Sequence, residues 1–177
     1  MRKLQFGEIK SILSKLGAIS VFHYLTDDEK WELLKICEIF QYEQNERIIF
    51  QGETGTNFFA VLSGAINITT YDSDSGKEVF LSGIGAGEFF GEAGIFCNTK
   101  RTANVSAATT AEIICVERSD FFKFIGKFTS AGVKILLLFV DGLLKKLSSS
   151  NKELAFERRD VMDQSAIDQF LQAIKNE

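Results

Sequence analysis

The spacing of hydrophobic and polar residues changes twice along the 177-residue chain. Residues 1–40 have a helical pattern, in which Thr26 and Glu29 form a capping box ahead of an apolar helix side. Residues 41–118 instead contain short apolar runs separated by glycine-bearing turns, which is typical of many short antiparallel strands. Helical spacing returns over residues 119–160. The pattern therefore predicts an α+β chain, in which an antiparallel β-sandwich, barrel or roll is flanked by N-terminal helices and a long C-terminal helix.

Glycine and polar residues mark the turns of this central segment. Residues 72–76 form a polar loop with a glycine near its end, as tight hairpins require. Further glycines stand at positions 52, 64, 83, 85, 87 and 91. We therefore expect a hairpin at 72–76 and other chain reversals at these glycines.

One face of the C-terminal helical segment carries an apolar stripe. Its members are alternately four and three residues apart, which is heptad spacing: Leu136, Val140, Leu143, Leu147, Ser150 and Leu154. Such a stripe is expected where a helix packs against its own domain, and equally where it forms the seam of a homodimer. The apolar run at 135–140 is broader than one seam needs, so the pattern is compatible with both contacts. Residues 161–177 form a polar tail of mixed charge.

Composition is that of an ordinary globular protein, because 45% of the residues are hydrophobic and 25% are charged. A net charge of −4 argues against a surface that binds nucleic acid, although it leaves room for one small anionic ligand in a pocket. The longest apolar run is too short to span a bilayer, and no signal-peptide pattern opens the chain. The three cysteines lack a CxxC spacing, so we expect buried thiols in a reducing compartment. The prediction is a cytoplasmic protein without a membrane segment.

The sequence lacks several common catalytic and cofactor motifs. The glycine-rich stretch 83–91 has no register that fits the dinucleotide fingerprint GxGxxG. His23 is the only histidine and stands among apolar residues, where we expect it to be packed in a helix. With one histidine and no paired cysteines, neither a zinc site nor a histidine-activated nucleophile is predicted. We expect no enzyme activity and no cofactor or metal.

A different chemistry is concentrated at residues 87–106. Gly91 and Gly94 lie on either side of Glu92, so the backbone can turn tightly there and present N–H groups to an oxyanion. Glu92 can accept a hydrogen bond from a sugar hydroxyl, and the planar guanidinium of Arg101 suits a phosphate. These residue types predict a site for a small nucleotide with an accessible phosphate. Taken alone, they also fit an ordinary surface salt bridge between Glu92 and Arg101.

The order of these residues resembles the phosphate-binding cassette of the cyclic nucleotide-binding domain family. The matching positions run from an apolar residue and Gly-Glu to an arginine, a hydroxyl residue and alanine: Phe90, Gly91, Glu92, Ala93, Gly94, Ile95, Arg101, Thr102 and Ala103. Residues 48–64 resemble a second signature of the family, with Gly52, Gly55 and Gly64 at its spacings. The two signatures stand in the family's order along the chain.

The resemblance implies a jelly-roll-like β-roll flanked by helices, and it assigns roles to the cassette residues. Glu92 would bind the ribose 2′-hydroxyl, and Arg101 would bind the exocyclic oxygens of a 3′,5′-cyclic phosphate. Gly91 and Ala93 would contribute backbone N–H groups. The implied ligand is cAMP or cGMP.

Two cassette residues bear on that ligand. Thr102 would add a polar contact; threonine at this position is sometimes linked with cGMP in the family but also occurs in cAMP binders. Lys100 stands where the family often has proline. It should add positive charge near the phosphate without abolishing binding.

The resemblance also suggests where the base would be read. In family members of the catabolite activator type, the last helix forms the dimer seam, and polar residues along it contact the purine. Ser149, Ser150 and Asn151 stand at the comparable place, and polar side chains in an otherwise apolar seam are costly unless something satisfies them. They are therefore candidate base readers. The alternative is a helix segment that faces water.

The function implied by the resemblance is a cyclic-nucleotide sensor that signals through its C-terminal helix to an unidentified effector protein. Only about 20 residues follow Arg158, too few for a winged helix-turn-helix, so direct DNA binding is not expected. One alternative is a non-enzymatic interaction or scaffold domain that has the fold but does not depend on a ligand. Another is a regulatory piece of a larger protein.

Overall fold

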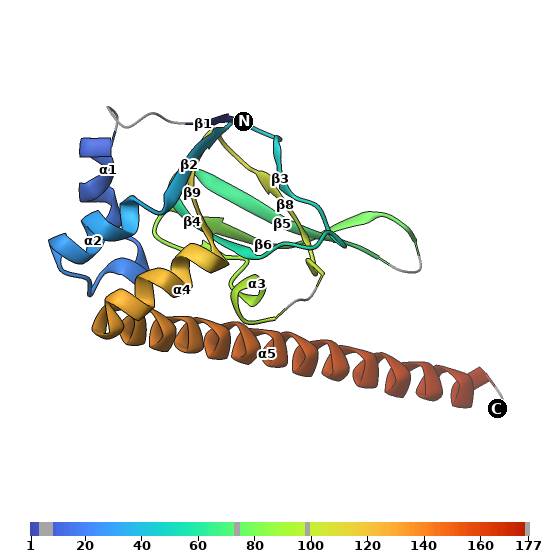
Figure 1. Ribbon diagram of the computed structural model, residues 1–177. Helices are drawn as coiled ribbons and strands as arrows, with labels where there is room; N and C mark the ends of the chain where they lie inside the picture. The colour runs from blue at the N-terminus through green and yellow to red at the C-terminus, as the bar shows by residue number, and fades with distance from the viewer. Residues whose placement is uncertain (4–8, 73–74, 98–99, 176–177) are drawn as a thin grey trace. The chain divides into compact units, whose positions relative to one another are not determined.

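The structure is a computed structural model that describes residues 1–3, 9–72, 75–97 and 100–175 (Figure 1). The chain forms two compact units, Met1–Leu138 and Phe139–Glu177. The first unit contains both sheets and the shorter helices. The long helix α5 (Thr129–Lys175) begins in the first unit and continues through the second.

The elements of the first unit follow one another in a simple order. It opens with β1 (Arg2–Lys3), α1 (Ile9–Leu16), the 3-10 helix η2 (Ser20–Phe22) and α2 (Asp27–Leu34). The strands are β2 (Cys37–Tyr42), β3 (Arg47–Ile49), β4 (Asn57–Ser63), β5 (Ala65–Tyr71), β6 (Glu78–Gly85), β7 (Phe89–Phe90), β8 (Asn104–Ala107) and β9 (Ala111–Glu117). The short helix α3 (Ala93–Phe96) lies between β7 and β8, and α4 (Arg118–Lys127) follows β9.

The described strands form two antiparallel sheets, with strand orders β1-β2-β9-β4-β7 and β3-β8-β5-β6. Early strands pair with late ones, since β2 pairs with β9 and β3 pairs with β8. Strands β5 and β6 pair as a hairpin, and Gly76 in the loop between them has a φ of 63°. The predicted α+β class, with an antiparallel roll flanked by helices, is confirmed.

Alternating side chains along the strands build an apolar core inside the roll. Its buried members are Tyr42, Ile49, Phe59, Val61, Ile66, Ile84, Phe90, Val105, Ala107, Ala111, Ile113 and Cys115. On the other face of β4, Phe58 lies between Phe22 and Phe121, with ring centroids 6.5 and 5.4 Å away. Strand β4 is thus buried on both faces, which explains its continuous apolar sequence.

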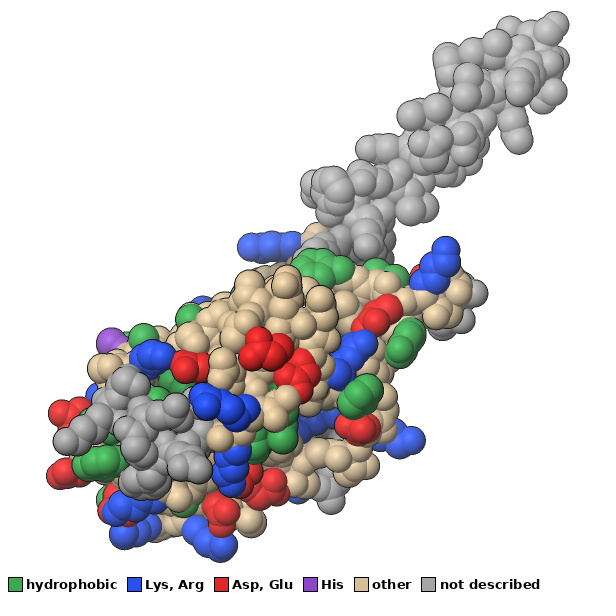
Figure 2. Space-filling model, turned by 90° about the horizontal axis from the view of Figure 1, so that it is seen from above, with side chains coloured by type: hydrophobic (Ala, Val, Ile, Leu, Met, Phe, Trp, Pro, Cys, Tyr) green, Lys and Arg blue, Asp and Glu red, His purple; other side chains and the backbone are tan. Residues whose placement is uncertain are grey.

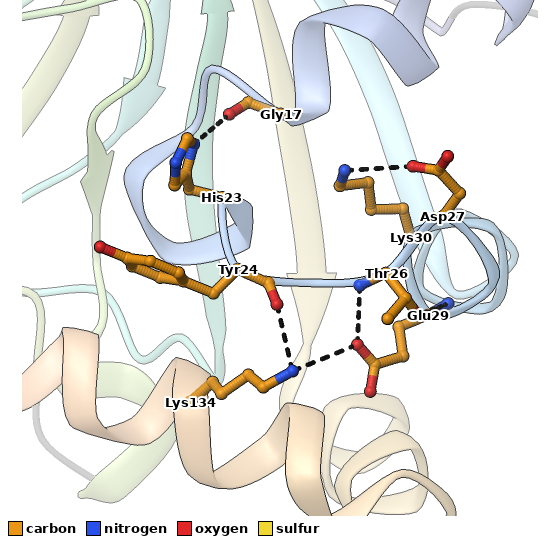
Figure 3. Close-up of polar contacts among 8 residues, drawn as sticks. All are labelled: Gly17, His23, Tyr24, Thr26, Asp27, Glu29, Lys30 and Lys134. Atoms are coloured by element: carbon orange, nitrogen blue, oxygen red, sulfur yellow. Dashed lines mark hydrogen bonds and ion pairs between the residues drawn. The ribbon is translucent and has the colours of Figure 1, made fainter.

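A polar cluster joins the N-terminal helices to the start of α5 (Figure 3). The predicted capping box is present: the Glu29 N–H donates to Thr26 Oγ1 at 3.3 Å, and the Thr26 N–H donates to Glu29 Oε2 at 2.8 Å. Lys134 of α5 donates to the Tyr24 carbonyl at 3.1 Å, and its Nζ lies 3.7 Å from Glu29 Oε2. One carboxylate therefore caps α2 and pairs with α5.

The N-terminal segment differs from the predicted helical pattern in two respects. Helix α2 ends at Leu34, and Cys37 begins β2, because residues 37–42 pair along their whole length with β9. His23 was expected to be packed, but it is exposed, and its Nδ1 lies 3.0 Å from the Gly17 carbonyl oxygen (Figure 3).

Charged side chains of both signs are mixed on the face of the molecule shown in Figure 2. A nucleic-acid-binding surface would concentrate Lys and Arg in one patch or stripe, and no such concentration is seen among the described residues on this face. In the part of the chain that the structure covers, no helix is long and apolar enough to cross a membrane.

Candidate functional site

The described part of the segment 87–106 contains β7, a turn at Glu92, the short helix α3 and most of β8. Gly91 follows β7 with a φ of 73°, a conformation that glycine adopts without strain. Glu92 is the N-cap residue of α3, and the turn is closed by the Gly94 N–H, which donates to the Gly91 carbonyl at 3.0 Å. Gly91 and Ala93, the expected amide donors, thus flank Glu92 where the chain leaves the sheet.

Backbone hydrogen bonds fix the far end of this segment to the loop between β3 and β4. The Arg101 N–H donates to the Glu53 carbonyl at 2.8 Å, and the Arg101 carbonyl accepts from the Gly52 N–H at 2.8 Å. Lys100 forms an isolated antiparallel bridge with Thr54. Because its backbone is held on both sides, the Arg101 side chain starts from a defined point.

The Arg101 guanidinium is half-buried and is held by neutral oxygen atoms. Its Nη2 donates to the Asn57 carbonyl at 2.7 Å and to Asn57 Oδ1 at 2.6 Å, and its Nη1 donates to the Gly91 carbonyl at 3.1 Å. Its Cζ lies 5.7 Å from the centre of the Phe59 ring, which places the cation over an aromatic face.

Three glycines make room for this group, and together with Asn57 and Phe59 they define what we term the guanidinium slot. A Cβ at Gly55 would stand 2.5 Å from Arg101 Nη2, and one at Gly91 or Gly94 would stand 2.9 or 3.0 Å from Nη1. Each distance is shorter than a normal non-bonded contact. Any side chain at Gly55, Gly91 or Gly94 would therefore crowd the guanidinium.

Burial and nearby charges act on Arg101 in opposite directions. Burial has the larger effect and lowers the pKa of the Arg101 guanidinium, whereas the carboxylates of Glu117, Glu53 and Glu92 raise it. Arginine keeps its proton in proteins, so the slot holds a half-buried cation. Glu92 is only 5% exposed, and the two residues therefore do not form the exposed surface salt bridge that their types alone allowed.

The remaining predicted residues occupy several environments. Phe90 is buried, and its ring stacks on Phe59 with centroids 5.0 Å apart. Within the cassette, Ala103 is half-buried and Thr102 is exposed. Ser149, Ser150 and Asn151 lie on α5 in the second unit, where all three are exposed, and their role as base readers stays a prediction.

The structure adds two residues that the sequence did not single out. Asn57 supplies two of the oxygens around Arg101. Arg118, the first residue of α4, reaches back to the cassette: its Nε donates to the Gly94 carbonyl at 3.0 Å and its Nη2 to the Cys97 carbonyl at 2.9 Å. A half-buried arginine needs acceptors, but that need does not say which residue supplies them, so nothing in the sequence pointed to Asn57.

The cysteines correct one expectation. Cys115 is buried and Cys37 is half-buried, but Cys97 at the end of α3 is exposed. Burial raises the pKa of the Cys115 thiol to about 11 and also raises that of Cys37. Cys115 therefore stays a neutral thiol near pH 7.

Comparison with known proteins identifies the family of the chain. Residues 39–128 match the family model described as the cyclic nucleotide-binding domain. The chain belongs to this family. The matched region contains the whole cassette, the guanidinium slot and all of α4.

Curated relatives include two kinds of regulated protein. The chain is 32% identical over 119 residues to the cAMP-activated global transcriptional regulator CRP of Haemophilus influenzae, covering 67% of this chain and 51% of that protein. It is 30% identical over 126 residues to the cGMP-dependent protein kinase egl-4 of Caenorhabditis briggsae, covering 71% of this chain and 17% of the kinase. The chain thus spans about half or less of the length of these relatives.

Solved structures show the same fold. The catabolite activator protein of Thermus thermophilus has a TM-score of 0.68 and 25% identity, over 77% of this chain and 62% of that one. The regulatory domain of Toxoplasma gondii PKA with cAMP has a TM-score of 0.63 and 23% identity, over 81% of this chain and 51% of that one. The matched domain is regulatory rather than catalytic.

Proposed function

We propose that this protein is a cAMP or cGMP sensor, which binds the nucleotide inside the β-roll and passes its ligand state to a partner through α4 and α5. The observation that carries the proposal is the guanidinium slot beside Glu92. A half-buried cation held directly by neutral oxygens is stabilised further when an anion enters. The cyclic phosphate would supply that anion.

The chemistry of the two key side chains divides the ligand between them. Arg101 has five N–H donors, of which Asn57 and Gly91 use three, so donors remain for the exocyclic oxygens of a phosphate. The Glu92 carboxylate would accept a hydrogen bond from the ribose 2′-hydroxyl. Relatives named for cAMP and for cGMP support both nucleotides equally, so the base is left to experiment.

Signal transmission would begin at Arg118. This residue joins the carbonyls of the cassette to the first turn of α4, so a ligand that moves the cassette acts on that helix. If the nucleotide binds more tightly when the helix is in one position than in another, binding would shift the population toward the tighter-binding position. The size of the shift is set by that difference in affinity. Helix α5 would then contact an effector or a second copy of the chain.

Titration calorimetry with cAMP and cGMP tests the proposal, with 5′-AMP as a control that lacks the cyclic phosphate. We expect saturable binding of at least one cyclic nucleotide. Arg101→Ala should weaken it by roughly 2–4 kcal/mol, because a charge-assisted phosphate contact is lost. No heat and no thermal shift with either nucleotide would favour the ligand-independent scaffold instead. Unchanged affinity in Arg101→Ala would mean that Arg101 has a structural role.

A further inference from the structure

We propose that Asn57 is a positioning residue that sets the Arg101 guanidinium for the phosphate, and that Cys115 orients the Asn57 amide for this task. The inference rests on the proposed function, because it concerns how the same site holds its ligand. It gives a residue of strand β4 a role in a site whose proposed ligand contacts come from the cassette.

Both Nη2 contacts of Arg101 are made to Asn57, at 2.7 Å to the backbone oxygen and 2.6 Å to Oδ1. With the Nη1 contact to Gly91, they use three of the five guanidinium protons. The Nε proton and one Nη1 proton remain, and no described residue accepts either of them. Asn57 thus fixes one end of the planar group while leaving donors for an anion.

An asparagine side chain can accept a hydrogen bond from an arginine only when its oxygen, not its NH2 group, faces the guanidinium. Cys115 settles this choice, because Asn57 Nδ2 donates to Cys115 Sγ at 3.1 Å. Cys115 is 8% exposed, and its raised pKa keeps the thiol neutral. A thiol is a weak acceptor, yet it is a partner for the NH2 end that leaves Oδ1 directed at Arg101.

The sheet holds Asn57 itself in place. Asn57 is the first residue of β4 and lies opposite Glu117 of β9 in the antiparallel register. The preceding residue, Thr56, donates through Oγ1 to Glu117 Oε1 at 2.5 Å and accepts the Arg118 N–H on its carbonyl at 3.1 Å. Arg101 is therefore positioned from a strand that is tied to the start of α4, which is a more rigid support than a loop.

The test compares the nucleotide affinity of Asn57→Ala in two backgrounds. In the otherwise wild-type protein we expect the dissociation constant of the better-bound nucleotide to rise about tenfold, because a hydrogen bond to a charged group is lost. In the Arg101→Ala background the same substitution should change affinity less than about twofold, since its target is gone. An equal loss in both backgrounds would show a merely structural role and overturn the inference, as would unchanged affinity in Asn57→Ala.

Two substitutions of Cys115 form a matched pair that tests its orienting role. Cys115→Ser keeps an acceptor for the Asn57 amide and should keep affinity within about twofold, whereas Cys115→Ala should weaken binding about threefold. Equal affinity of the two variants would overturn the orienting role. Circular dichroism and thermal melting of each variant verify that it folds.

A ligand-free measurement separates this inference from the proposed function. In the wild type, NMR of the Arg101 guanidinium should show slow rotation of its Nη groups, and Asn57→Ala should speed it. Slow rotation in both proteins would overturn the positioning role even if nucleotide binds. Slow rotation only in the wild type, without binding of either cyclic nucleotide, would support the positioning of Arg101 while refuting the sensor.

Discussion

The guanidinium slot is narrowest at Gly55, where an added Cβ would stand 2.5 Å from Nη2, 2.6 Å from Nε and 2.8 Å from Cζ of Arg101. These atoms belong to the end of a flexible side chain, so the fold can tolerate Gly55→Ala while the guanidinium is displaced. We expect calorimetry to show nucleotide affinity at least about tenfold weaker, with little change in melting temperature.

Gly126 of α4 supplies the control for this substitution. A Cβ there would meet no atom within 4 Å apart from its chain neighbours and its own helix backbone, and alanine is more favourable than glycine in a helix. Gly126→Ala should therefore leave affinity unchanged and raise stability slightly. Equal affinity of the two alanine variants would contradict the slot.

Glu78 should make the stability of the roll depend on pH. Hydrogen bonds from Arg47 and Thr69 lower its pKa from an ordinary 4.5 to about 2, and Arg47 Nη1 lies 2.7 Å from its Oε1. The stabilisation is therefore fully present above pH 4.5 and is lost as the pH falls through about 2. Chemical denaturation should show Glu78→Gln less stable than wild type at pH 7, with the difference vanishing near pH 2. A difference that is constant with pH would show that the charge of Glu78 is not the cause.

The residues of the site differ in whether the sequence alone is enough to propose a role for them. Glu92 and Arg101 stand in a recognisable order with Gly91, so the sequence alone was enough to propose a nucleotide site at these residues. Asn57 could not, because its contact with Arg101 joins positions 44 residues apart and depends on backbone hydrogen bonds between Arg101 and the loop before β4. An asparagine at the end of a glycine-containing turn has many ordinary explanations.

At the scale of elements, the Arg118 side chain connects α3 to α4 through hydrogen bonds. Arg118→Ala would remove the donors to the carbonyls of Gly94 and Cys97 while leaving both helices otherwise intact. We expect a loss of about 1–3 kcal/mol in stability and faster amide hydrogen exchange across residues 93–97. Arg118→Lys, which keeps the charge but not the planar fork, should restore only part of the protection. Unchanged exchange in Arg118→Ala would show that this join does not hold the cassette.

Elements with local signals were predicted well, and those without them were not. The capping box at Thr26 marked the start of α2, and the polar loop at 72–76 marked the hairpin between β5 and β6. Residues 37–40 were assigned to the helical segment because a short apolar run after a helix has no pattern of its own. These residues form a strand because they pair with β9. That partner lies far along the chain, so the local sequence could not show the pairing.

At the scale of the whole molecule, α5 exposes an apolar stripe. Leu137, Val140, Leu143, Leu144 and Leu147 are all at least 38% exposed. We expect this face to form a homodimer seam, with sedimentation giving twice the monomer mass. Leu147→Glu should yield monomers, whereas Lys145→Glu, away from the stripe, should leave the dimer intact. Wild-type monomers at high concentration, with and without nucleotide, would exclude the dimer.

Strand order was the part of the fold that periodicity could not supply. Alternation predicts strands and their buried faces, but it does not say that β9 lies between β2 and β4. The roll was expected only through the resemblance of two short glycine-containing segments to a known family. Local pattern thus predicted the class of structure, while long-range pairing determined its topology.

The pairing of early strands with late ones also governs how the chain can fold. Ile39 of β2 lies opposite Ile114 of β9, and Arg47 of β3 lies opposite Ser106 of β8. Such distant contacts require long loops to close, which slows folding. During synthesis, β2 and β3 leave the ribosome long before their partners, so their unpaired edges stay exposed until β8 and β9 emerge. The roll should therefore close late and cooperatively, after the last strand has been made.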